Sequence, residues 1–428
     1  MPSLYEDLSF RGLLRQETAG IRAVLDGPPV AAYHGIDPTA DSLHIGNLYG
    51  VCTLKRFQDH GHHPIALAGG GTGLIGDPGG RDDERPLLSA EQHAANLAGI
   101  EAQLERLLAV EAGPGGRGQV MLIDNADWLV GCRLVDFLRE VGKHFSVNQM
   151  IQKESVRSRI ERPDVGISYT EFSYMLLQAY DFLHLYDHFG CRVQFGGSDQ
   201  WGNITAGIEL IRRVRRGEAH GFTWPLLVSS EGKKYGKSVG AAIWLDARRT
   251  PPFQLYQHFV RVGDSEVGPM LRLLTFLAHE EIEALDAATS QHPARREAQR
   301  ALASEVCRLV HGEAETKRAE RASGALYSEE IATLDERLLL EVVAEAPSSS
   351  ISRAELDGAG ADLAGLLAAT GLSPSRGAAR TAVEQGGAYV NNVRRQGPKA
   401  RVTRDDLLHD RYVLLRRGRR DYHLLRVE

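Results

Sequence analysis

The sequence predicts an α/β fold, in which a parallel sheet wrapped by helices precedes an α-helical domain and a small α+β domain. Short apolar runs alternate with helical patterns through the first half of the chain. Apolar residues at helical spacing dominate residues 253–340, and short strand-like runs flank a turn at Asn391 and Asn392. Alternating strands and helices are typical of a parallel sheet, whose ligands bind at the carboxyl ends of its strands.

The elements follow from the apolar patterns in chain order. Strands are expected where short apolar runs occur, at residues 30–36, 63–68, 119–124 and 192–195. Helices are expected up to about His60 and over residues 129–141 and 170–189. These patterns and the Pro- and Ser-rich stretch before residue 351 predict domains over residues 1–250, 251–345 and 351–428, with a linker at 346–350.

Size and composition are those of an ordinary globular protein. The chain has 428 residues, 43% of them hydrophobic, which is enough for two or three domains with their own cores. The four cysteines are far apart, so we expect reduced thiols and no structural zinc. The N-terminal residues lack a basic start with an apolar core, and no apolar run is long enough to span a bilayer. We therefore expect a cytoplasmic protein with no membrane partner.

Charge is distributed unevenly along the chain. The formal net charge is −6, but residues 351–428 hold 14 Lys and Arg against 9 Asp and Glu, a balance of +5. The rest of the chain therefore carries −11. A basic C-terminal module on an acidic body suits a polyanionic partner. A solvated basic surface without such a partner remains the alternative.

The segment 37–47 (Asp-Pro-Thr-Ala-Asp-Ser-Leu-His-Ile-Gly-Asn) follows the first apolar run and opens a helix. Unpaired N–H groups and the positive end of the helix dipole favour an anion there, so a phosphate is the expected ligand. We expect Ser42 or Asp41 to cap the helix, and Gly46 to let a ligand approach the backbone closely. An ordinary strand–turn–helix corner has similar residues, and this segment alone does not decide between the two.

A glycine-rich loop at residues 69–78 follows the second strand and precedes two arginines, Arg81 and Arg85. Glycines permit close backbone approach, Asp77 suits a cationic amine, and arginines suit phosphate oxygens. The alternative is a flexible surface turn with solvated arginines.

The helix at residues 169–182 is apolar over most of its surface, yet Tyr174, Gln178 and Asp181 form one polar stripe at i, i+4 and i+7. Buried polar groups need partners, because each one left unsatisfied costs about 1 to 3 kcal/mol. A small polar ligand would satisfy the stripe, and a narrow solvent-facing edge is the alternative.

Two further loops carry polar groups. In residues 196–203, Asp199 is placed like the carboxylates that accept ribose hydroxyl groups in nucleotide folds, although helix capping alone also explains it. In residues 231–240, glycines surround Lys234 and Lys237, which suit a phosphate as compact point charges. On that loop alone, solvated lysines are the simpler interpretation.

Together these segments resemble the signatures of class I aminoacyl-tRNA synthetases. Segment 37–47 resembles their "HIGH" motif, and residues 234–238 (Lys-Tyr-Gly-Lys-Ser) resemble their "KMSKS" motif. The loops and the polar-striped helix are similar to those of the bacterial, tyrosine-specific branch, and the match runs through nearly the whole chain. Residues 373–376 and 386–391 are similar to the small RNA-binding module that such enzymes carry. The resemblance implies a Rossmann-like catalytic domain, an α-helical domain on the anticodon side and a C-terminal RNA-binding domain.

The resemblance also implies residue roles. The phenol of tyrosine would contact Tyr33 and Asp181, its amino group Asp77, Tyr174 and Gln178, and its carboxylate end Gln200. The nucleotide would contact Gly35, Asp37, His44, Gly46, Asn47, Asp199 and Lys237, with Asp199 at the ribose and Gly46 under the adenine. The transition-state donors would be Thr39, His44, Lys234, Lys237, Arg81 and Arg85.

By the same resemblance, the chain activates L-tyrosine with ATP and transfers it to the terminal ribose of tyrosine tRNA. No enzyme nucleophile is needed, because the tyrosine carboxylate attacks the α-phosphate in line, and catalysis comes from positioning and charge stabilisation. Mg²⁺ is expected to arrive with ATP, since the sequence shows no dedicated metal cage. The family also implies a homodimer, with residues 128–142 as a contact region.

Two residues depart from the family pattern. Asn47 stands where the first motif has histidine, and its amide still donates a hydrogen bond. His34 stands where relatives often have cysteine beside the ribose, which leaves the ribose contacts open.

Three other functions share part of the pattern. A tryptophan-specific synthetase has no use for the hydroxyl-reading pair Tyr33 and Asp181. A nucleotidyltransferase acting on a small metabolite shares the first motif but not the basic tail. An RNA-binding or regulatory protein with an inactive synthetase body disagrees with the cationic, hydroxyl and imidazole groups, which all look intact.

Overall fold

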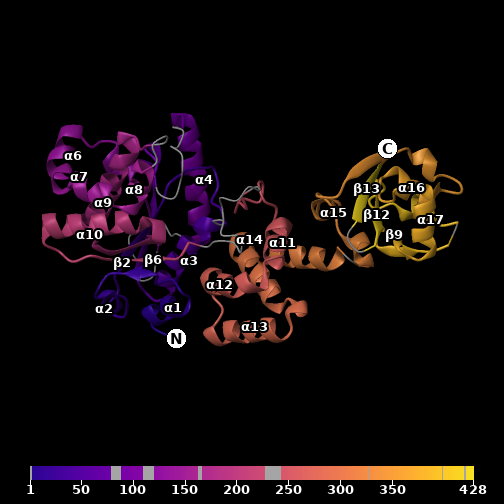
Figure 1. Cartoon of the computed structure of the whole chain (residues 1–428), viewed down its shortest axis with the longest axis horizontal. Coiled ribbons are helices and arrows are strands. Elements are labelled where there is room, and N and C mark those ends of the chain that lie inside the picture. Colours follow the sequence, from indigo (N-terminus) through magenta and orange to yellow (C-terminus); the bar gives the residue numbers. More distant parts are fainter. Residues whose placement is uncertain are drawn as a thin grey trace. The chain divides into compact units, whose positions relative to one another are not determined.

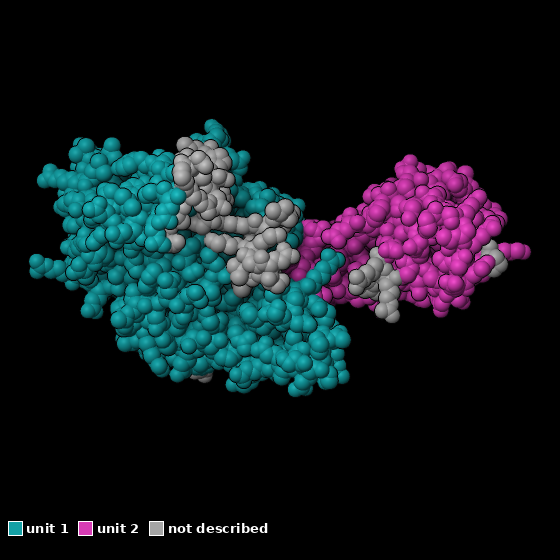
Figure 2. Space-filling view, viewed as in Figure 1, with its two compact units in different colours: residues 1–250, 261–310 teal, residues 251–260, 311–428 magenta. Residues whose placement is uncertain are grey.

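The structure is a computed structural model that describes residues 2–78, 88–108, 120–161, 166–226, 242–326, 328–397, 399–418 and 421–428. Its contacts divide the chain into two compact units (Figure 2). The N-terminal unit comprises Met1–Thr250 and Arg261–Val310, and the C-terminal unit comprises Pro251–Val260 and His311–Glu428. Within the described ranges, no helix is both long and apolar enough to cross a membrane.

A six-stranded sheet forms the centre of the N-terminal unit (Figure 1). Its order is β1 (Gln16–Glu17), β6 (His220–Trp224), β5 (Cys191–Gly197), β2 (Ala31–Ile36), β3 (His63–Ala68) and β4 (Met121–Asp124). All neighbours are parallel except β1, which pairs antiparallel with β6. The four predicted strands are confirmed, while β1 and β6 were not predicted. Chain order reverses beside β2, and such a switch point is where open α/β sheets bind ligands.

Helices cover both faces of this sheet. On one face, α9 (Tyr169–Phe189) and α10 (Trp201–Arg215) lie side by side (Figure 1). Phe182 of α9 shares a core with Tyr33 and Ile65 of the sheet. On the other face, Phe57 of α3 (Ile45–Asp59) stacks on Phe195 of β5 with ring centroids 5.1 Å apart. Because successive side chains of a strand point to opposite faces, β2 contributes to both sides of the sheet, with Tyr33 in the core under α9 and His34 against Phe195.

The N-terminal unit has ten further helices among the described residues, the last of them only in part. They are α1 (Leu4–Phe10), α2 (Ile21–Leu25), α4 (Ala90–Leu108), α5 (Ala126–Leu129), α6 (Leu134–Glu140), α7 (Val147–Ile151), α8 (Glu154–Ile160), α12 (Asp264–Leu274), α13 (His279–Gln291) and the first part of α14 (Glu297–Ala325). The helix predicted over residues 129–141 is confirmed as α6 but wrong in its first turn, because α5 ends at Leu129 and α6 begins at Leu134. Gly131 lies in the break, where its backbone freedom disfavours helix.

The C-terminal unit combines helices with a second sheet. Its helices are α11 (Pro252–Val260), the latter part of α14 (Glu297–Ala325), α15 (Glu336–Val342), α16 (Leu363–Ala369) and α17 (Arg376–Glu384). The sheet order is β10 (Val393–Arg395), β9 (Ala388–Val390), β12 (Tyr412–Arg417), β13 (Asp421–Val427) and β7 (Ser348–Ile351). A separate pair joins β8 (Ala361–Asp362) and β11 (Arg401–Val402).

The predicted turn at Asn391 and Asn392 is confirmed. Both residues have positive φ, 50° and 62°, and they join the antiparallel strands β9 and β10. Asparagine tolerates this left-handed region better than most residues, which is why it is favoured in tight hairpins.

The predicted linker at residues 346–350 is wrong in its second half. Ser348, Ser349 and Ser350 belong to β7, which pairs parallel with β13. Their polar side chains suggested a loop, but the backbone hydrogen bonds of a strand do not depend on apolar side chains. One apolar core also runs from Ala322 to Val343 and from Leu408 to Leu424, so residues on both sides of the expected linker share it.

Candidate active site

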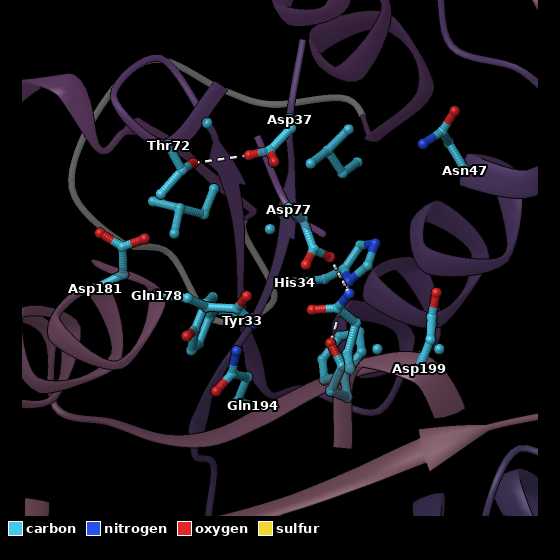
Figure 3. A pocket seen from close by; sticks show the side chains of 18 of the residues that line it. Tyr33, His34, Asp37, Asn47, Thr72, Asp77, Gln178, Asp181, Gln194 and Asp199 are labelled. Atoms are coloured by element: carbon cyan, nitrogen blue, oxygen red, sulfur yellow. Dashed lines mark hydrogen bonds between the residues drawn. The ribbon is translucent and has the colours of Figure 1, made fainter. Parts of the chain in front are cut away.

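A cleft of about 320 Å³ opens at the carboxyl ends of the central strands β2, β3 and β5 (Figure 3). It is lined by thirteen of the predicted site residues, namely Tyr33, Gly35, Asp37, Thr39, His44, Gly46, Asn47, Asp77, Tyr174, Gln178, Asp181, Asp199 and Gln200. Arg81, Arg85, Lys234 and Lys237 lie outside the described residues. In Figure 3, Asp181 and Gln178 lie on one side of the view, Asn47 and Asp199 on the other, and Asp77 between them.

One end of the cleft holds a buried carboxylate in a fixed orientation. Asp181, 2% exposed, accepts a hydrogen bond from Trp128 Nε1 (2.8 Å) at one oxygen and from Asn125 Nδ2 (2.9 Å) at the other. Burial raises the pKa of Asp181, and the two donors oppose that rise. The hydroxyl of Tyr33 is buried and has no partner among the described residues. This end can therefore take a ligand hydroxyl.

Asp37 is held by two hydroxyl groups. Thr72 Oγ1 donates to Asp37 Oδ1 (2.7 Å) and Tyr174 OH donates to Asp37 Oδ2 (2.9 Å). Burial, with Asp37 and Asp77 close by, raises the pKa of Tyr174, so this phenol stays a neutral donor. The structure thus joins the segment 37–47 directly to the polar stripe of α9.

The middle of the cleft contains a chain of amides that ends on Asp77. Gln200 Nε2 donates to Asp77 Oδ2 (2.5 Å), and Asn203 Nδ2 contacts Gln200 Oε1 (3.1 Å) and Gln178 Oε1 (3.0 Å). Asp77 is 7% exposed. A buried carboxylate aimed into a polar cleft suits a cationic amine.

The other end of the cleft is built by the start of α3. The helix begins at Ile45, and His44 is its N-cap, so the prediction that Ser42 or Asp41 caps it is wrong. His44 Nδ1 accepts from Gly46 N–H (2.9 Å), and Asn47 Oδ1 accepts from His44 N–H (3.0 Å). With Nδ1 accepting, a neutral imidazole carries its proton on Nε2 and is a hydrogen-bond donor there.

Glycine at position 46 is required by this cap. A Cβ atom there would lie 2.7 Å from His44 Cε1. The same glycine lines the cleft, so it serves both the capping histidine and the approach of a ligand.

His34 lies on β2 with its ring against Phe195 and Trp224. Its Nδ1 contacts the carbonyl oxygen of Phe195 (3.1 Å) and must therefore donate, which leaves Nε2 as an acceptor. Burial lowers the pKa of His34 to about 4. A Cβ atom at Gly50 would lie 2.2 Å from His34 Nε2, so the ring fits because residue 50 is glycine.

Five polar residues that support the site were missed by the sequence reasoning, namely Thr72, Asn125, Trp128, Gln194 and Asn203. Asn125 directly follows strand β4, so the rule that ligands gather at carboxyl ends of strands would have found it. Gln194 is 3% exposed inside a strand, and a polar residue in an apolar run was the available signal. No local pattern marks Trp128, whose partner Asp181 lies 53 residues along the chain, or the contact of Asn203 with Gln178, 25 residues away.

Comparisons with known proteins agree with this geometry. A family model described as tRNA synthetases class I (W and Y) matches residues 26–328, and one described as tyrosine–tRNA ligase SYY-like C-terminal domain matches residues 343–425. The chain is 49% identical to the tyrosine–tRNA ligase of Roseiflexus castenholzii over 427 residues, covering 100% of both chains. It is 47% identical to that of Bacillus caldotenax over 426 residues, covering 99% of both chains.

Solved structures give the same result. A C-terminally truncated mitochondrial tyrosyl-tRNA synthetase from Aspergillus nidulans matches with a TM-score of 0.69 and 33% identity. The match covers 76% of this chain and 95% of that one.

Proposed function

The chain belongs to the class I aminoacyl-tRNA synthetases and, among them, to the tyrosine–tRNA ligases, and on that premise we propose which of its residues carry each step. The enzyme activates L-tyrosine with ATP to tyrosyl-adenylate and pyrophosphate, and then transfers the tyrosine to the 3′-terminal ribose of its tRNA. The cleft at the switch point of the sheet is the observation that supports the residue assignment. It contains Tyr33 and Asp181 at one end and the N-terminus of α3 at the other.

Tyr33 and Asp181 read the substrate phenol. Asp181 accepts the phenolic hydrogen while Trp128 and Asn125 hold its oxygens, and Tyr33 offers a hydroxyl with no partner among the described residues. Phenylalanine would leave both groups unpaired, a principle for which tyrosyl-tRNA synthetases are the standard example. Tryptophan offers no hydroxyl for this pair.

Asp77, Tyr174 and Gln178 bind the amino group of tyrosine, and Gln200 binds its carboxylate end. The amide chain from Gln178 to Asp77 supports this assignment, because it orients carboxylate and amide oxygens that accept from an ammonium group. Held in this way, the tyrosine carboxylate attacks the α-phosphate of ATP in line, its oxygen forming a bond to phosphorus as pyrophosphate leaves.

ATP binds at the other end of the cleft. Gly35, Asp37, Gly46, Asn47 and Asp199 contact the nucleoside, with Asp199 at the ribose and Gly46 under the adenine. Thr39 and His44 donate to the phosphates, and the capped imidazole supports this role because its Nε2 carries the proton.

Lys234, Lys237, Arg81 and Arg85 supply positive charge to the departing pyrophosphate, a role that rests on the family motifs alone. Mg²⁺ accompanies ATP. Among the described residues, no group of three or more His, Cys, Asp or Glu side chains is arranged to hold a metal ion.

The remaining parts serve tRNA. We propose that residues 251–345, which the structure divides between its two units, serve the anticodon side, and that residues 351–428 bind RNA, which the balance of +5 in the latter supports. If so, the apparent affinity for tRNA falls steeply with salt concentration, and a flat dependence would contradict the assignment. We place the enzyme in the cytoplasm, where its substrates are found, and cell fractionation tests this.

Tyrosine-dependent exchange of pyrophosphate into ATP tests the proposal directly. The intact protein is assayed with tyrosine, phenylalanine and tryptophan, and only tyrosine is expected to support exchange. Tyr33→Phe removes one hydrogen bond to the phenol, worth about 1 kcal/mol or roughly fivefold in kcat/KM for tyrosine. Stability should not fall in this variant, because the hydroxyl makes no hydrogen bond with the described residues.

Lys237→Ala is expected to abolish most exchange while the protein stays folded. Near-normal exchange in that variant, or equal exchange with phenylalanine in the wild type, would contradict the proposed roles.

A further inference from the structure

A buried polar stripe on α4 packs against the segment 37–47. His93, Asn96 and Gln103 are 6%, 2% and 7% exposed, and their spacing places them along one side of the helix. No step of the reaction described above uses them. Buried polar side chains on a helix are retained where they find partners, and two of these three find theirs in the segment.

Asn96 holds the start of the segment. Its Nδ2 donates to the carbonyl oxygen of Pro38 (3.1 Å), next to Thr39, and its Oδ1 accepts from Gln92 Nε2 (2.8 Å). A Cβ atom at Gly99 would lie 2.3 Å from the carbonyl oxygen of Asp41. The helix therefore approaches the segment at backbone contact distance.

Gln103 holds the middle of the segment. Its Oε1 accepts from Leu43 N–H (3.0 Å) and its Nε2 donates to Ser42 Oγ (3.1 Å). Ser42 Oγ also accepts from Asp246 N–H (3.2 Å) and donates to the carbonyl oxygen of Leu43 (2.8 Å). The serine hydroxyl thus uses its one donor and both acceptor sites, and the amide orientation is fixed by the N–H it faces.

The backbone next to His44 is therefore held from two sides. On the side away from α4, Leu245 N–H donates to the carbonyl oxygen of Leu43 (2.8 Å), and Ile45 N–H donates to that of Ile243 (3.1 Å). His44 lies between these two bonds. Ser42 joins both sides, because it contacts Gln103 and Asp246 at once.

We propose that Gln103 is a positioning residue for tyrosine activation, which through Ser42 and the Leu43 peptide fixes the backbone that aims His44 at the phosphates of ATP. The inference rests on the proposed role of His44 as a phosphate donor. A misplacement of about 1 Å lowers a reaction rate by up to about 100-fold, so the loss of this support appears in the rate of the chemical step.

The experiment compares single-turnover adenylate formation in Gln103→Met and Gln299→Met. Gln299 is the matched control, a buried glutamine of the same unit that is 1% exposed and donates to Asp264 Oδ1 (2.7 Å). Gln103→Met is expected to lower the first-order rate constant by about 10- to 100-fold and to leave the tyrosine dissociation constant at its wild-type value. Gln299→Met is expected to lose comparable thermal stability and keep the wild-type rate.

Gln103→Glu supplies a rescue. Its carboxylate still accepts from Leu43 N–H, and the Ser42 hydroxyl can turn from the Leu43 carbonyl to donate to it, so it should recover part of the rate that Gln103→Met loses. A wild-type rate in Gln103→Met, an equal loss in Gln299→Met, or equal losses in tyrosine affinity and rate would each overturn the proposal.

His44→Ala distinguishes a failure of the proposed phosphate contact from a failure of the positioning role of Gln103. If His44→Ala forms adenylate at the wild-type rate, the proposed function of the segment fails. If His44→Ala is slow and Gln103→Met is not, only the positioning role fails.

Discussion

At the scale of single residues, the site depends on groups whose protonation is set by burial. Asp181, Tyr174 and His34 all have pKa values displaced by desolvation. The imidazole of His34 donates from Nδ1 to the Phe195 carbonyl oxygen, and its ring occupies the space that a side chain at Gly50 would fill. The neutral ring therefore has its Nε2 as a hydrogen-bond acceptor. Histidine fits at position 34 only because residue 50 of α3 is glycine.

His34 makes stability dependent on pH. Its pKa is about 4 in the folded protein and 6.5 ordinarily. Between these values the unfolded chain binds a proton that the folded protein does not, so the free energy of unfolding falls as the pH falls from 6.5 towards 4. At pH 5 the loss is about 2 kcal/mol.

Urea unfolding at pH 7 and pH 5 checks this for the wild type and His34→Cys. The variant should lose less stability on acidification, because the other histidines contribute equally to both proteins. Equal losses would show that His34 titrates normally.

At the scale of elements, α9 carries the polar stripe that we propose binds tyrosine, and the helix is fixed at its start. Ser168 caps the helix by accepting from Glu171 N–H (3.2 Å). Glu171 pairs with Arg159 of α8 at 3.0 Å, and both side chains are 2% exposed. Arg159 also donates to the carbonyl oxygen of Gly166 (3.0 Å). Each of these buried charges depends on the other, because a charge left without its partner in the interior has a large desolvation cost.

Breaking this pair on one side should be costly. Glu171→Leu leaves a buried guanidinium without its carboxylate and is expected to lower the free energy of unfolding by about 3 to 5 kcal/mol. Arg159→Met combined with Glu171→Leu should recover most of that loss, because no charge then stays buried.

Denaturant unfolding measures both variants. The control is Glu161→Gln, which removes an exposed pair with Arg157 on the same helix and should cost less than about 1 kcal/mol. Additive losses in the double variant would contradict the proposed coupling.

At the scale of the whole molecule, an apolar surface on the N-terminal unit is exposed. Val130, Leu134, Val135 and Leu138 are 68%, 71%, 72% and 44% exposed, and they lie within the region 128–142 expected to form a dimer contact. Exposed apolar patches of this kind mark interaction sites. We therefore propose that two copies of the chain associate through α6 and the neighbouring Val130.

Sedimentation equilibrium tests the dimer. The wild type should have twice the chain mass of 47.0 kDa, and Leu134→Glu combined with Val135→Glu should shift it towards the single-chain mass without unfolding it. Ala98→Glu, at an exposed position of α4, is the control and should leave the mass unchanged. A single-chain mass for the wild type would rule the interface out.

Residues 351–428 contribute to the apolar core of the C-terminal unit, so deleting them is not a clean test of RNA binding. Removing residues 351–428 would uncover Ile331, Leu334 and Leu339, which share a core with Leu414 and Leu424. A truncation would therefore combine a loss of RNA contacts with a loss of stability.

The sequence by itself determined the periodic and local features of this protein. The four parallel strands, the stripe of α9 and the turn at Asn391 follow from spacing and residue type, and the ordered motifs identify the cleft residues. Charge counting separated the basic tail from the acidic body. Each of these depends only on residues that are close in sequence.

Only the tertiary structure decided which groups support one another. His44, rather than Ser42, caps α3, because Ser42 is already used by Gln103 and Asp246, residues 61 and 204 positions away. Trp128 orients Asp181, and Gly50 makes room for His34, through contacts that no local pattern predicts. The serines at 348–350 suggested a linker, but their backbone pairs with β13 and forms the strand β7. Long-range hydrogen bonds and packing override local preference because a buried polar group must find its partner wherever the fold brings one.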